Sequence, residues 1–344
     1  MPARQRADLD YANLSFAFHP TDMNVRYTWR DGHWDAGVES SSETVPLHVA
    51  ATCLHYGQAA FEGLKIYEAK DGRVLSFRMG ENAKRMQFSA GMLEMAAPPV
   101  ELFREAVLRA VRANQRFIPP YGCGATLYVR PLLIGTGPRI GVRPADEYML
   151  IVLVTPVGPY FKRGFSSTKV RLEEEADRAA PRGIGSVKAA GNYAAGLRAT
   201  MRAWGDGYGE ALYLDASERK YIEELGAANF FGITKDKRYV TPKSPSVLRS
   251  ITNLSLRTLA ADLGYRVEER PMPLEELDEL VEAGACGTAA VITPIERITV
   301  RGRDVVYLPD GKPGPHCTAL YQALTAIQFG EVEDKYGWTE EIPL

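Results

Sequence analysis

The sequence predicts an α/β protein of the mixed (α+β) kind, built from two domains. Its 344 residues exceed what one hydrophobic core usually supports. Short runs rich in β-branched and aromatic residues alternate with stretches in which apolar residues have helical spacing. A segment rich in Gly, Pro and Ser separates two such halves and is the expected linker, at 158–168. We therefore expect a smaller domain over 1–157, a larger one over 169–344, and a cleft between them that suits a small molecule.

The first half contains two clear strand patterns and one helical pattern. The strands are expected at 126–130 and 148–156, where β-branched and aromatic residues dominate. The stretch 101–117 has apolar residues at spacings of three and four, which is typical of a helix that covers a sheet. The residues of this stripe are Leu102, Phe103, Ala106, Val107, Ala110 and Val111.

The second half repeats the mixture of strands and helices. Its strand patterns are short apolar runs rich in β-branched or aromatic residues, and its helical patterns again follow the spacing of three and four. The expected strands are 169–172, 211–215, 229–234 and 289–293, and the expected helices are 253–264 and 316–329.

Composition excludes several classes of partner. With 41 Lys plus Arg against 43 Asp plus Glu, the net charge of −2 gives no field that would hold nucleic acid or an acidic membrane face. The N-terminus has charges where a signal peptide needs an apolar core, and no stretch reaches the roughly 18 apolar residues of a membrane span. We expect a cytoplasmic protein that binds neither nucleic acid nor membranes.

Cysteines and histidines give no sign of a metal site. The four cysteines lie far apart without a CxxC pair, which argues against a zinc knuckle and against a secreted disulfide scaffold. The five histidines show no H-x-x-x-H or similar ligand spacing. We expect no metal, and a packing role for His55.

Lys188 is the first candidate for chemistry. The segment GIGSVKAAGNYAAGL (183–197) places this lysine among small residues, with the aromatic hydroxyl of Tyr193 five positions later. A lysine is almost never buried without a reason, and small neighbours would let a flat ring approach its amine. A covalent bond to a cofactor is one such reason. A surface lysine in a Gly-rich loop explains the segment equally well.

Other segments offer the groups that a pyridoxal-phosphate enzyme needs. Glu223 and Glu224 stand just before the expected strand 229–234, where a carboxylate could keep a pyridine nitrogen protonated. Around Ser250, Thr252 and Asn253 a loop enters a helix, so that free N–H groups could point at a phosphate.

Gly287 and Thr288, immediately before the expected strand at 289–293, could add a hydroxyl and a close backbone approach to the same anion. Each of these signals also has an ordinary explanation. The acidic pair fits a solvated charge run, the helix start is of a common sort, and the Gly-Thr pair fits a simple turn.

Taken together, the residues resemble the branched-chain aminotransferases of the class IV, D-alanine-aminotransferase-like group, which have pyridoxal-phosphate fold type IV. The resemblance runs through most of the chain, and the combination of HYGQ..FEGLK, LYVRP and K..GNY in one order is highly specific. It is carried by FHPTDMN (18–24), DGHWDAG (31–37), LHYGQAAFEGLKIY (54–67), ENAKRMQFSAGML (81–93), LYVRPLLIGTG (127–137), VGPYF (157–161), VKAAGNYAAGLRA (187–199), ALYLDASERKYIEELGAANFF (211–231) and GACGTAAVITPI (284–295).

The resemblance implies pyridoxal 5′-phosphate as the cofactor and gives roles around it. Lys188 resembles the lysine that forms the Schiff base, and Tyr193 the tyrosine that bonds the ring oxygen. Glu224, in E-L-G-x-x-N, resembles the partner of the pyridine nitrogen. The implied phosphate ligands are Arg85 of ENAKR, Ile251 and Thr252 at the helix start, and Thr288 of GTAA.

The resemblance also implies the substrates, which are L-leucine, L-isoleucine, L-valine, L-glutamate and their 2-oxo acids. An aromatic wall of Phe61, Tyr128 and Tyr160 would surround the aliphatic side chain. Tyr56 and Arg130 would accept the second carboxylate of glutamate, because a guanidinium can hold a carboxylate that bare aromatic walls would reject. A homodimer or higher homo-oligomer is implied as well.

Two departures concern the anion contacts. Ala227 and Ala228 replace the Ser- or Thr-like donors and Met that the family often has, so the substrate's α-carboxylate would rely on the backbone N–H groups of Thr288 and Ala289. The usual G-V-T-R of the phosphate turn reads Ser-Ile-Thr-Asn at 250–253, which keeps the hydroxyl but loses a glycine and an arginine.

A third departure concerns redox control. The CxxC of mammalian members is absent, because Ala290 and Thr293 stand at those places. We expect no thiol switch.

Two kinds of rival stay open at this point. A D-amino-acid aminotransferase or an aminodeoxychorismate lyase would share Lys188 and Glu224 and differ in the pocket. A non-catalytic or nucleotide-binding protein would use Gly-rich loops such as GDGYG (205–209), although that spacing fits neither a dinucleotide fingerprint nor a P-loop.

Overall fold

The computed structural model describes residues 5–159 and 165–344, and contacts within the chain divide it into two compact units. The first unit comprises Met1–Lys162, Val187–Gly191 and Ala326–Leu344, and the second comprises Arg163–Ser186 and Asn192–Thr325. Residues 326–344, which the sequence placed in the second domain, therefore belong to the first unit, as does the short segment around Lys188.

A nine-stranded antiparallel sheet forms the body of the first unit, with the central order β19-β6-β5-β7-β8-β1-β2. Strand β3 pairs with β1, and β4 pairs with β7. The strands are β1 (Asn24–Arg30), β2 (His33–Trp34), β3 (Val38–Ser40), β4 (Ala59–Phe61), β5 (Leu64–Glu68), β6 (Val74–Phe77), β7 (Thr126–Gly135), β8 (Glu147–Val157) and β19 (Thr339–Glu341).

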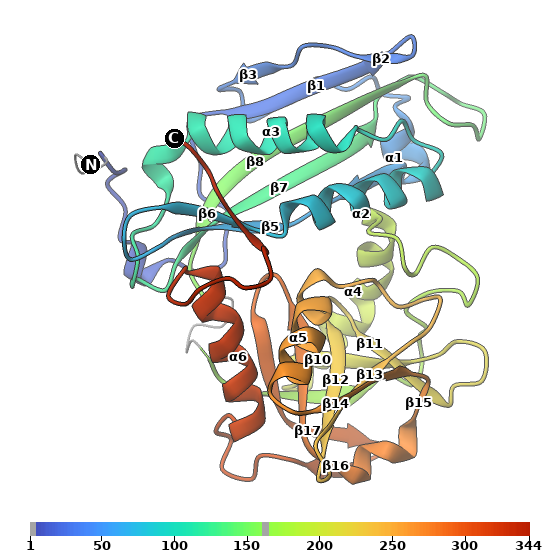
Figure 1. Ribbon diagram of the computed structural model, residues 1–344. Coiled ribbons are helices and arrows are strands. Elements are labelled where there is room, and N and C mark those ends of the chain that lie inside the picture. Colours follow the sequence, from blue (N-terminus) through green and yellow to red (C-terminus); the bar gives the residue numbers. More distant parts are fainter. Residues whose placement is uncertain (1–4, 160–164) are drawn as a thin grey trace. The chain divides into compact units, whose positions relative to one another are not determined.

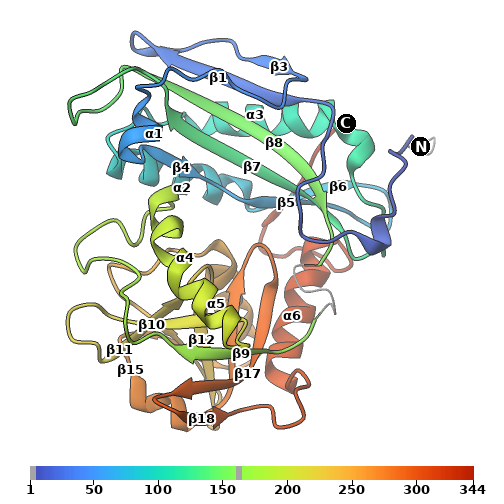
Figure 2. The ribbon, with the colours of Figure 1, turned by 180° about the vertical axis from the view of Figure 1, so that it is seen from behind.

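Two helices cover one face of this sheet. They are α2 (Met79–Met92) and α3 (Val100–Ala113), which lie along the strands in Figure 1 and behind them in Figure 2. The predicted apolar stripe of α3 is confirmed, since its residues from Phe103 to Val111 at helical spacing are fully buried and only Leu102 is half-buried. The short helices of this unit are η1 (Tyr11–Asn13), α1 (Thr52–Tyr56) and η2 (Gln115–Phe117).

Alternation along β7 separates core residues from the residues that face the other side. Leu127, Val129 and Leu133 join the core under α2 and α3. Tyr128 and Arg130 point to the opposite face, because successive side chains of a strand alternate. The strand extends to Gly135, beyond its predicted end at 130, and the carbonyl of Pro131 accepts a hydrogen bond from the N–H of Glu62 at 2.8 Å.

A ten-stranded mixed sheet forms the second unit, with the order β14-β13-β12-β16-β17-β9-β10-β11-β15. Strand β11 also pairs with β12, Glu224 opposite Asn229, which closes the strands from β12 to β11 into a ring. The strands are β9 (Thr168–Leu172), β10 (Glu210–Leu214), β11 (Tyr221–Leu225), β12 (Asn229–Thr234), β13 (Arg238–Pro242), β14 (Arg266–Arg270), β15 (Met272–Pro273), β16 (Leu280–Gly287), β17 (Val291–Val300) and β18 (Arg303–Val306), the last paired with β17.

Helices follow or connect these strands. Helix α5 (Ile251–Asp262) begins two residues before the predicted 253–264, and α6 (Pro315–Gln328) one residue before the predicted 316–329. Helix α4 (Ala190–Gly205) starts directly after the segment that carries Lys188. The short helix η3 (Leu274–Glu279) leads into β16.

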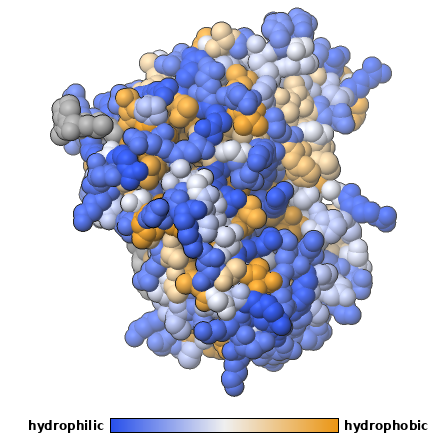
Figure 3. All heavy atoms as spheres, in the orientation of Figure 1, coloured by the Kyte–Doolittle hydropathy of each residue, from blue (hydrophilic) through white to orange (hydrophobic). Residues whose placement is uncertain are grey.

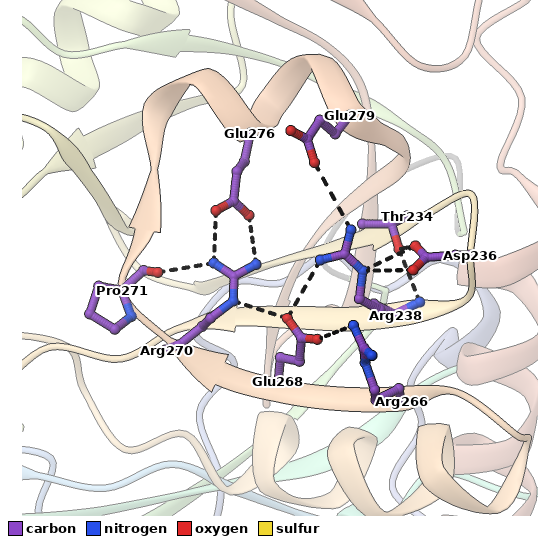
Figure 4. A network of polar contacts seen from close by, with 9 residues as sticks. All are labelled: Thr234, Asp236, Arg238, Arg266, Glu268, Arg270, Pro271, Glu276 and Glu279. Atoms are coloured by element: carbon purple, nitrogen blue, oxygen red, sulfur yellow. Dashed lines mark hydrogen bonds and ion pairs between the residues drawn. The ribbon is translucent and has the colours of Figure 1, made fainter.

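An ion-pair network stabilises the edge of the second sheet (Figure 4). Both terminal nitrogens of Arg270 donate to Glu276 at 2.8 Å, and its Nε donates to Glu268 at 2.9 Å. Arg238 pairs with Asp236 at 3.0 Å. Because β14 is an edge strand, these charges also make it a poor template for pairing with another chain.

The described residues contain no helix long and apolar enough to cross a membrane. Within the same residues, no group of three or more His, Cys, Asp and Glu side chains could hold a metal ion. The face drawn in Figure 3 is mainly hydrophilic, with hydrophobic side chains in scattered patches. The cytoplasmic location stays a prediction.

Candidate active site

The backbone of Lys188 is fixed on both sides within the first unit. Its N–H donates to Ser89 Oγ of α2 at 3.1 Å, and its carbonyl accepts from the N–H of Phe61 at 3.1 Å. The next residue, Ala189, forms a β-bridge with Ala60 of β4. These bonds exclude a loose Gly-rich loop, which was the plain alternative for this segment.

The amine of Lys188 lies over an aromatic ring. Its Nζ is 4.7 Å from the centroid of the Phe61 ring. Burial and, to a smaller extent, the nearby cation Arg85 lower the pKa of this lysine to about 8, while Glu62 opposes the shift. A lysine with such a pKa is neutral in a large fraction of molecules near pH 8, so it can act as a nucleophile or a base.

We expect this pKa to control how fast the cofactor-free protein captures pyridoxal phosphate. Only the neutral amine attacks an aldehyde, so the capture rate should rise about tenfold per pH unit below 8 and level off above it. Stopped-flow absorbance of the cofactor from pH 6 to 10 measures this profile. A rate that keeps rising to pH 10, as for an ordinary lysine, would contradict the assignment.

Arg85, the predicted phosphate ligand, lies on α2 and is held by a glutamate that the sequence did not single out. Its Nε donates to Glu62 Oε1 at 2.7 Å and its Nη2 to Glu62 Oε2 at 2.8 Å. Glu62 is fully buried and also accepts from Asn82 at 2.8 Å. The pair fixes the guanidinium in one orientation; its contact with a phosphate stays a prediction. Only the motif FEGLK hinted at Glu62.

Phe61 and Tyr128, two residues predicted for the aromatic wall, both lie close to Arg130, which was predicted for the second carboxylate. The Arg130 guanidinium lies 4.8 Å from the Phe61 ring centroid and 5.3 Å from that of Tyr128. Its Nη2 donates to the Tyr128 hydroxyl at 3.1 Å, while its buried Nε has no hydrogen-bond partner among the described residues. Gly63 is required here, because a Cβ at this position would lie 2.0 Å from the Tyr128 hydroxyl oxygen.

Tyr56 and Tyr160 were also predicted to bind the substrate. Tyr56 ends α1, is 40% exposed, and donates its hydroxyl to the carbonyl of Ile140. Among the described residues no hydrogen bond joins Tyr56 to Arg130. Their shared role in accepting the second carboxylate of glutamate stays a prediction. Tyr160 lies outside the described residues.

Glu224 is buried inside the second unit, where it accepts two hydrogen bonds and forms one ion pair. Asn229 donates to its Oε2 at 2.6 Å, the N–H of Leu248 donates to Oε1 at 3.0 Å, and Arg178 pairs with Oε1 at 3.0 Å. Burial raises the pKa of Glu224 to about 7, although these partners oppose the shift. Two of them, Arg178 and Asn229, carried no signal in the sequence beyond the N of E-L-G-x-x-N.

Neither glutamate of the 223–224 pair is a solvated surface charge. Both precede the strand at 229–234 as expected, but they also lie within a strand of their own, β11, and both are buried. Glu223 accepts from the Ser244 hydroxyl at 2.6 Å, which is a different partner set from that of Glu224. The two neighbours therefore face opposite sides of the strand.

The start of α5 has the geometry of an anion site. Ser250 is the N-cap among the three predicted candidates, and its hydroxyl accepts from the N–H of Asn253. The N–H groups of Ile251 and Thr252 have no partner inside the helix, because the first turn of a helix offers none. Leu248, two residues earlier, is bonded through both its N–H and its carbonyl to the Glu224–Asn229 pair. The helix start and the acid thus belong to one local structure.

The predicted strand 289–293 begins only at Val291, so Thr288 and Ala289 lie in the turn between β16 and β17. Val291 has a φ of 65°, which is rare for a β-branched residue. A Cβ on Gly287 would lie 3.9 Å from the carbonyl oxygen of Ala227, so this turn lies beside the turn that contains Ala227 and Ala228. Tyr193 lies in the first turn of α4.

Three comparisons with known proteins agree. The family model described as amino-transferase class IV matches residues 59–298. The branched-chain-amino-acid aminotransferase of Haemophilus influenzae is 47% identical over 341 residues, covering 97% of this chain and 99% of the relative. That of Helicobacter pylori is 45% identical over 337 residues, covering 97% and 98%.

Among solved structures, the Escherichia coli branched-chain amino acid aminotransferase has a TM-score of 0.77 at 29% identity, covering 92% of this chain and 99% of its own. The T.th. enzyme of the same name, solved with pyridoxamine 5′-phosphate, has a TM-score of 0.75 at 26% identity, covering 92% and 98%.

Proposed function

The chain belongs to the class IV aminotransferases, a family of pyridoxal-phosphate enzymes, and on this premise we propose that it is a branched-chain-amino-acid aminotransferase. It transfers the amino group of L-leucine, L-isoleucine or L-valine reversibly to 2-oxoglutarate, and the products are L-glutamate and the branched 2-oxo acid. The observation that carries the proposal most directly is the half-buried Lys188, whose backbone is fixed by hydrogen bonds, whose amine lies over Phe61 and whose pKa is lowered to about 8.

The chemistry of the donor set fits pyridoxal phosphate. An amine of low pKa suits its aldehyde, a buried carboxyl suits its pyridine nitrogen, and a capped helix start suits its phosphate. Lys188, Glu224 and the N–H groups of Ile251 and Thr252 would therefore hold it. Arg85 and Thr288 would complete the phosphate site, and Tyr193 would bond the ring oxygen.

When bound, the cofactor supplies a carbonyl carbon that exchanges amino groups and a ring that accepts electrons from the substrate's broken C–H bond. Lys188 would then take the proton from the substrate's α-carbon with its Nζ, because its low pKa leaves the amine neutral in about half of the molecules at pH 8. Glu224 would hold a proton at the pyridine nitrogen, and its own partners keep its carboxylate in place.

Phe61 and Tyr128 would form the apolar wall against the branched side chain, joined by Tyr160. Arg130, which lies over both rings with a buried Nε, would pair with the distal carboxylate when glutamate or 2-oxoglutarate occupies the same pocket. Tyr56, at the rim of the substrate pocket, would contribute to binding the same carboxylate. The α-carboxylate would be held by the backbone of the turn at Thr288 and Ala289.

Replacing Arg130 by Leu is expected to separate the two substrates. The KM for 2-oxoglutarate should rise at least about tenfold, because a buried charge-assisted pair is lost, whereas the KM for leucine should change less than about threefold. Steady-state kinetics with each substrate varied in turn measure this split. Equal effects on both substrates would show that Arg130 does not read the second carboxylate.

We also propose that the chain forms a homodimer or a higher homo-oligomer. Several large apolar side chains of the first unit are highly exposed, namely Val49 (82%), Ile140 (78%) and Val142 (83%), and such groups are often covered by a partner. Sedimentation velocity of the cofactor-loaded protein tests the proposal, and a monomer at micromolar concentration would contradict it.

The activity itself is tested by the half-reaction. L-Leucine, L-isoleucine and L-valine should each convert the absorbance of the bound cofactor to that of pyridoxamine phosphate, and 2-oxoglutarate should restore it. D-Alanine should not do so. Conversion by D-alanine alone would favour a D-amino-acid aminotransferase, and a colourless protein after incubation with the cofactor would contradict the whole proposal.

A further inference from the structure

We propose that Arg178 is a positioning residue for the reaction: it keeps the Glu224 carboxylate charged and ties the segment before Lys188 to the loop before α5. The inference rests on the proposed role of Glu224 at the pyridine nitrogen. Arg178 itself would touch neither substrate nor cofactor, and would act only through the groups that it holds.

One terminal nitrogen of Arg178 joins three parts of the second unit. Its Nη2 pairs with Glu224 Oε1 at 3.0 Å and donates to the carbonyl of Gly185 at 3.0 Å. It also donates to the carbonyl of Ser246. Gly185 stands three residues before Lys188, and Ser246 four residues before the N-cap Ser250. A single guanidinium therefore connects the lysine segment, the acid and the approach to the phosphate helix.

The junction is tightly packed and buried. The side chains of Arg178 and Glu224 are only 7% and 4% exposed. Gly185 fits there because it lacks a side chain: a Cβ would lie 2.5 Å from the Ser246 carbonyl oxygen and 2.9 Å from Arg178 Nη2. Breaking one member of such a buried pair leaves the other charge unpaired, which is costly.

Among the groups around Glu224, Arg178 supplies the positive charge that stabilises its carboxylate. Burial disfavours the charged carboxylate, and among its neighbours Glu223 also opposes ionisation. The thiol of Cys286 on β16 lies within range of the Glu224 charge and is itself neutral, since burial raises its pKa. Asn229 and the N–H of Leu248 stabilise the carboxylate through hydrogen bonds, and Arg178 stabilises it through its charge.

The charge state of Glu224 can be read in the cofactor-free protein, without any catalysis. Carbon-13 NMR of protein labelled at the glutamate carboxyl carbon follows the titration, and the Glu224 signal is identified by its loss in Glu224→Gln. The wild-type midpoint is expected at about 7. In Arg178→Met it should rise by at least about one pH unit, because an opposite charge at this distance lowers a carboxyl pKa by about that much or more.

Arg202→Met is the matched control. Arg202 also pairs with a buried glutamate of the same unit, Glu173 at 2.6 Å, but it is not among the groups that shift Glu224. Its removal should leave the Glu224 midpoint at the wild-type value. A wild-type midpoint in Arg178→Met, or an equal rise in Arg202→Met, would overturn the proposal.

A kinetic readout follows from the same shift. With its midpoint moved from 7 to 8, the ionised fraction of Glu224 at pH 7 falls about fivefold, so kcat should fall about fivefold at pH 7 and recover by pH 9. A purely structural defect would lower kcat equally at every pH, and that result would also overturn the proposal.

If Arg178→Met does not fold, the titration midpoint of Glu224 in Arg178→Lys tests the proposal in its place. Lysine keeps the charge but not the planar fork, so a midpoint near 7 supports the role of the charge and a midpoint near 8 contradicts it. Failure of the proposed function would be visible separately, as a wild-type protein that titrates as described yet transfers no amino group from leucine.

Discussion

Replacing Lys188 by Ala is expected to lower leucine turnover by about 10⁴-fold or more. The reason is that one amine would serve twice, as the attachment point of the cofactor and as the base for the α-proton. The measurement is kcat with saturating pyridoxal phosphate, together with the absorbance band of the bound cofactor, which should shift because no covalent bond forms.

Lys84→Ala serves as the control, since Lys84 lies on α2 of the same unit, is exposed, and pairs with Glu81 at 2.9 Å. Its turnover should stay within about twofold of wild type. Lys188→Ala should remain folded, because the amine is buried at a cost and its removal leaves the backbone bonds to Ser89 and Phe61 intact. Wild-type turnover in this variant would exclude Lys188 from the chemistry.

Replacing Glu224 by Gln is expected to lower kcat by about 10²- to 10³-fold, because a neutral amide cannot hold the pyridine nitrogen in its protonated form. The free energy of unfolding should also fall by roughly 2 to 3 kcal/mol, since Arg178 loses its buried counter-charge. Because the pKa of Glu224 is about 7, the carboxylate is lost as the pH falls through 7. The wild-type and variant rates should therefore converge at acid pH.

Glu223→Gln is the control for this prediction. It shows whether kcat depends on the Glu224 carboxylate in particular or falls whenever a buried carboxylate is lost. Glu223 is buried in the same strand but bonds to Ser244. Its variant should keep kcat within about threefold of wild type over the whole pH range. If Glu223→Gln fell as far as Glu224→Gln, the assignment of the pyridine partner would be wrong.

Local patterns in the sequence were sufficient to predict several elements of the fold. The stripe on α3 and the capped start of α5 depend on residues a few positions apart, so propensity and capping rules apply directly. Strand 229–234 was predicted with its observed bounds, because its run of apolar and aromatic residues is fully buried.

Features set by distant contacts could not be predicted in the same way. The C-terminal residues 326–344 belong to the first unit because β19 pairs with β6, a contact that spans most of the chain. Strand β7 continues through Pro131, which local rules treat as a strand breaker. The strand after Thr288 starts two residues late, because the turn needs Ala289 and Ala290, and Val291 adopts a left-handed φ there.

For the site, too, residues in local motifs could be predicted, and contacts between distant residues could not. Lys188, Phe61, Arg85, Tyr128 and Arg130 were named from motifs, and the structure brings them together in the first unit. Their partners were not named, because a buried ion pair such as that of Glu62 joins residues 23 positions apart in the sequence. Hydrogen-bond satisfaction of buried charges is a property of the folded chain, so it has no signature at fixed spacing.

Transfer of the amino group from leucine to 2-oxoglutarate is tested most directly by following the nitrogen itself. Purified, cofactor-loaded protein is incubated with ¹⁵N-labelled L-leucine and 2-oxoglutarate, and the products are measured by mass spectrometry. We expect ¹⁵N in L-glutamate in amounts equal to the 2-oxo acid formed from leucine, and no transfer by Lys188→Ala. Absence of ¹⁵N-glutamate with a fully loaded cofactor would contradict this function, as would ¹⁵N-glutamate formed from ¹⁵N-labelled D-alanine, and not from leucine, in a parallel incubation.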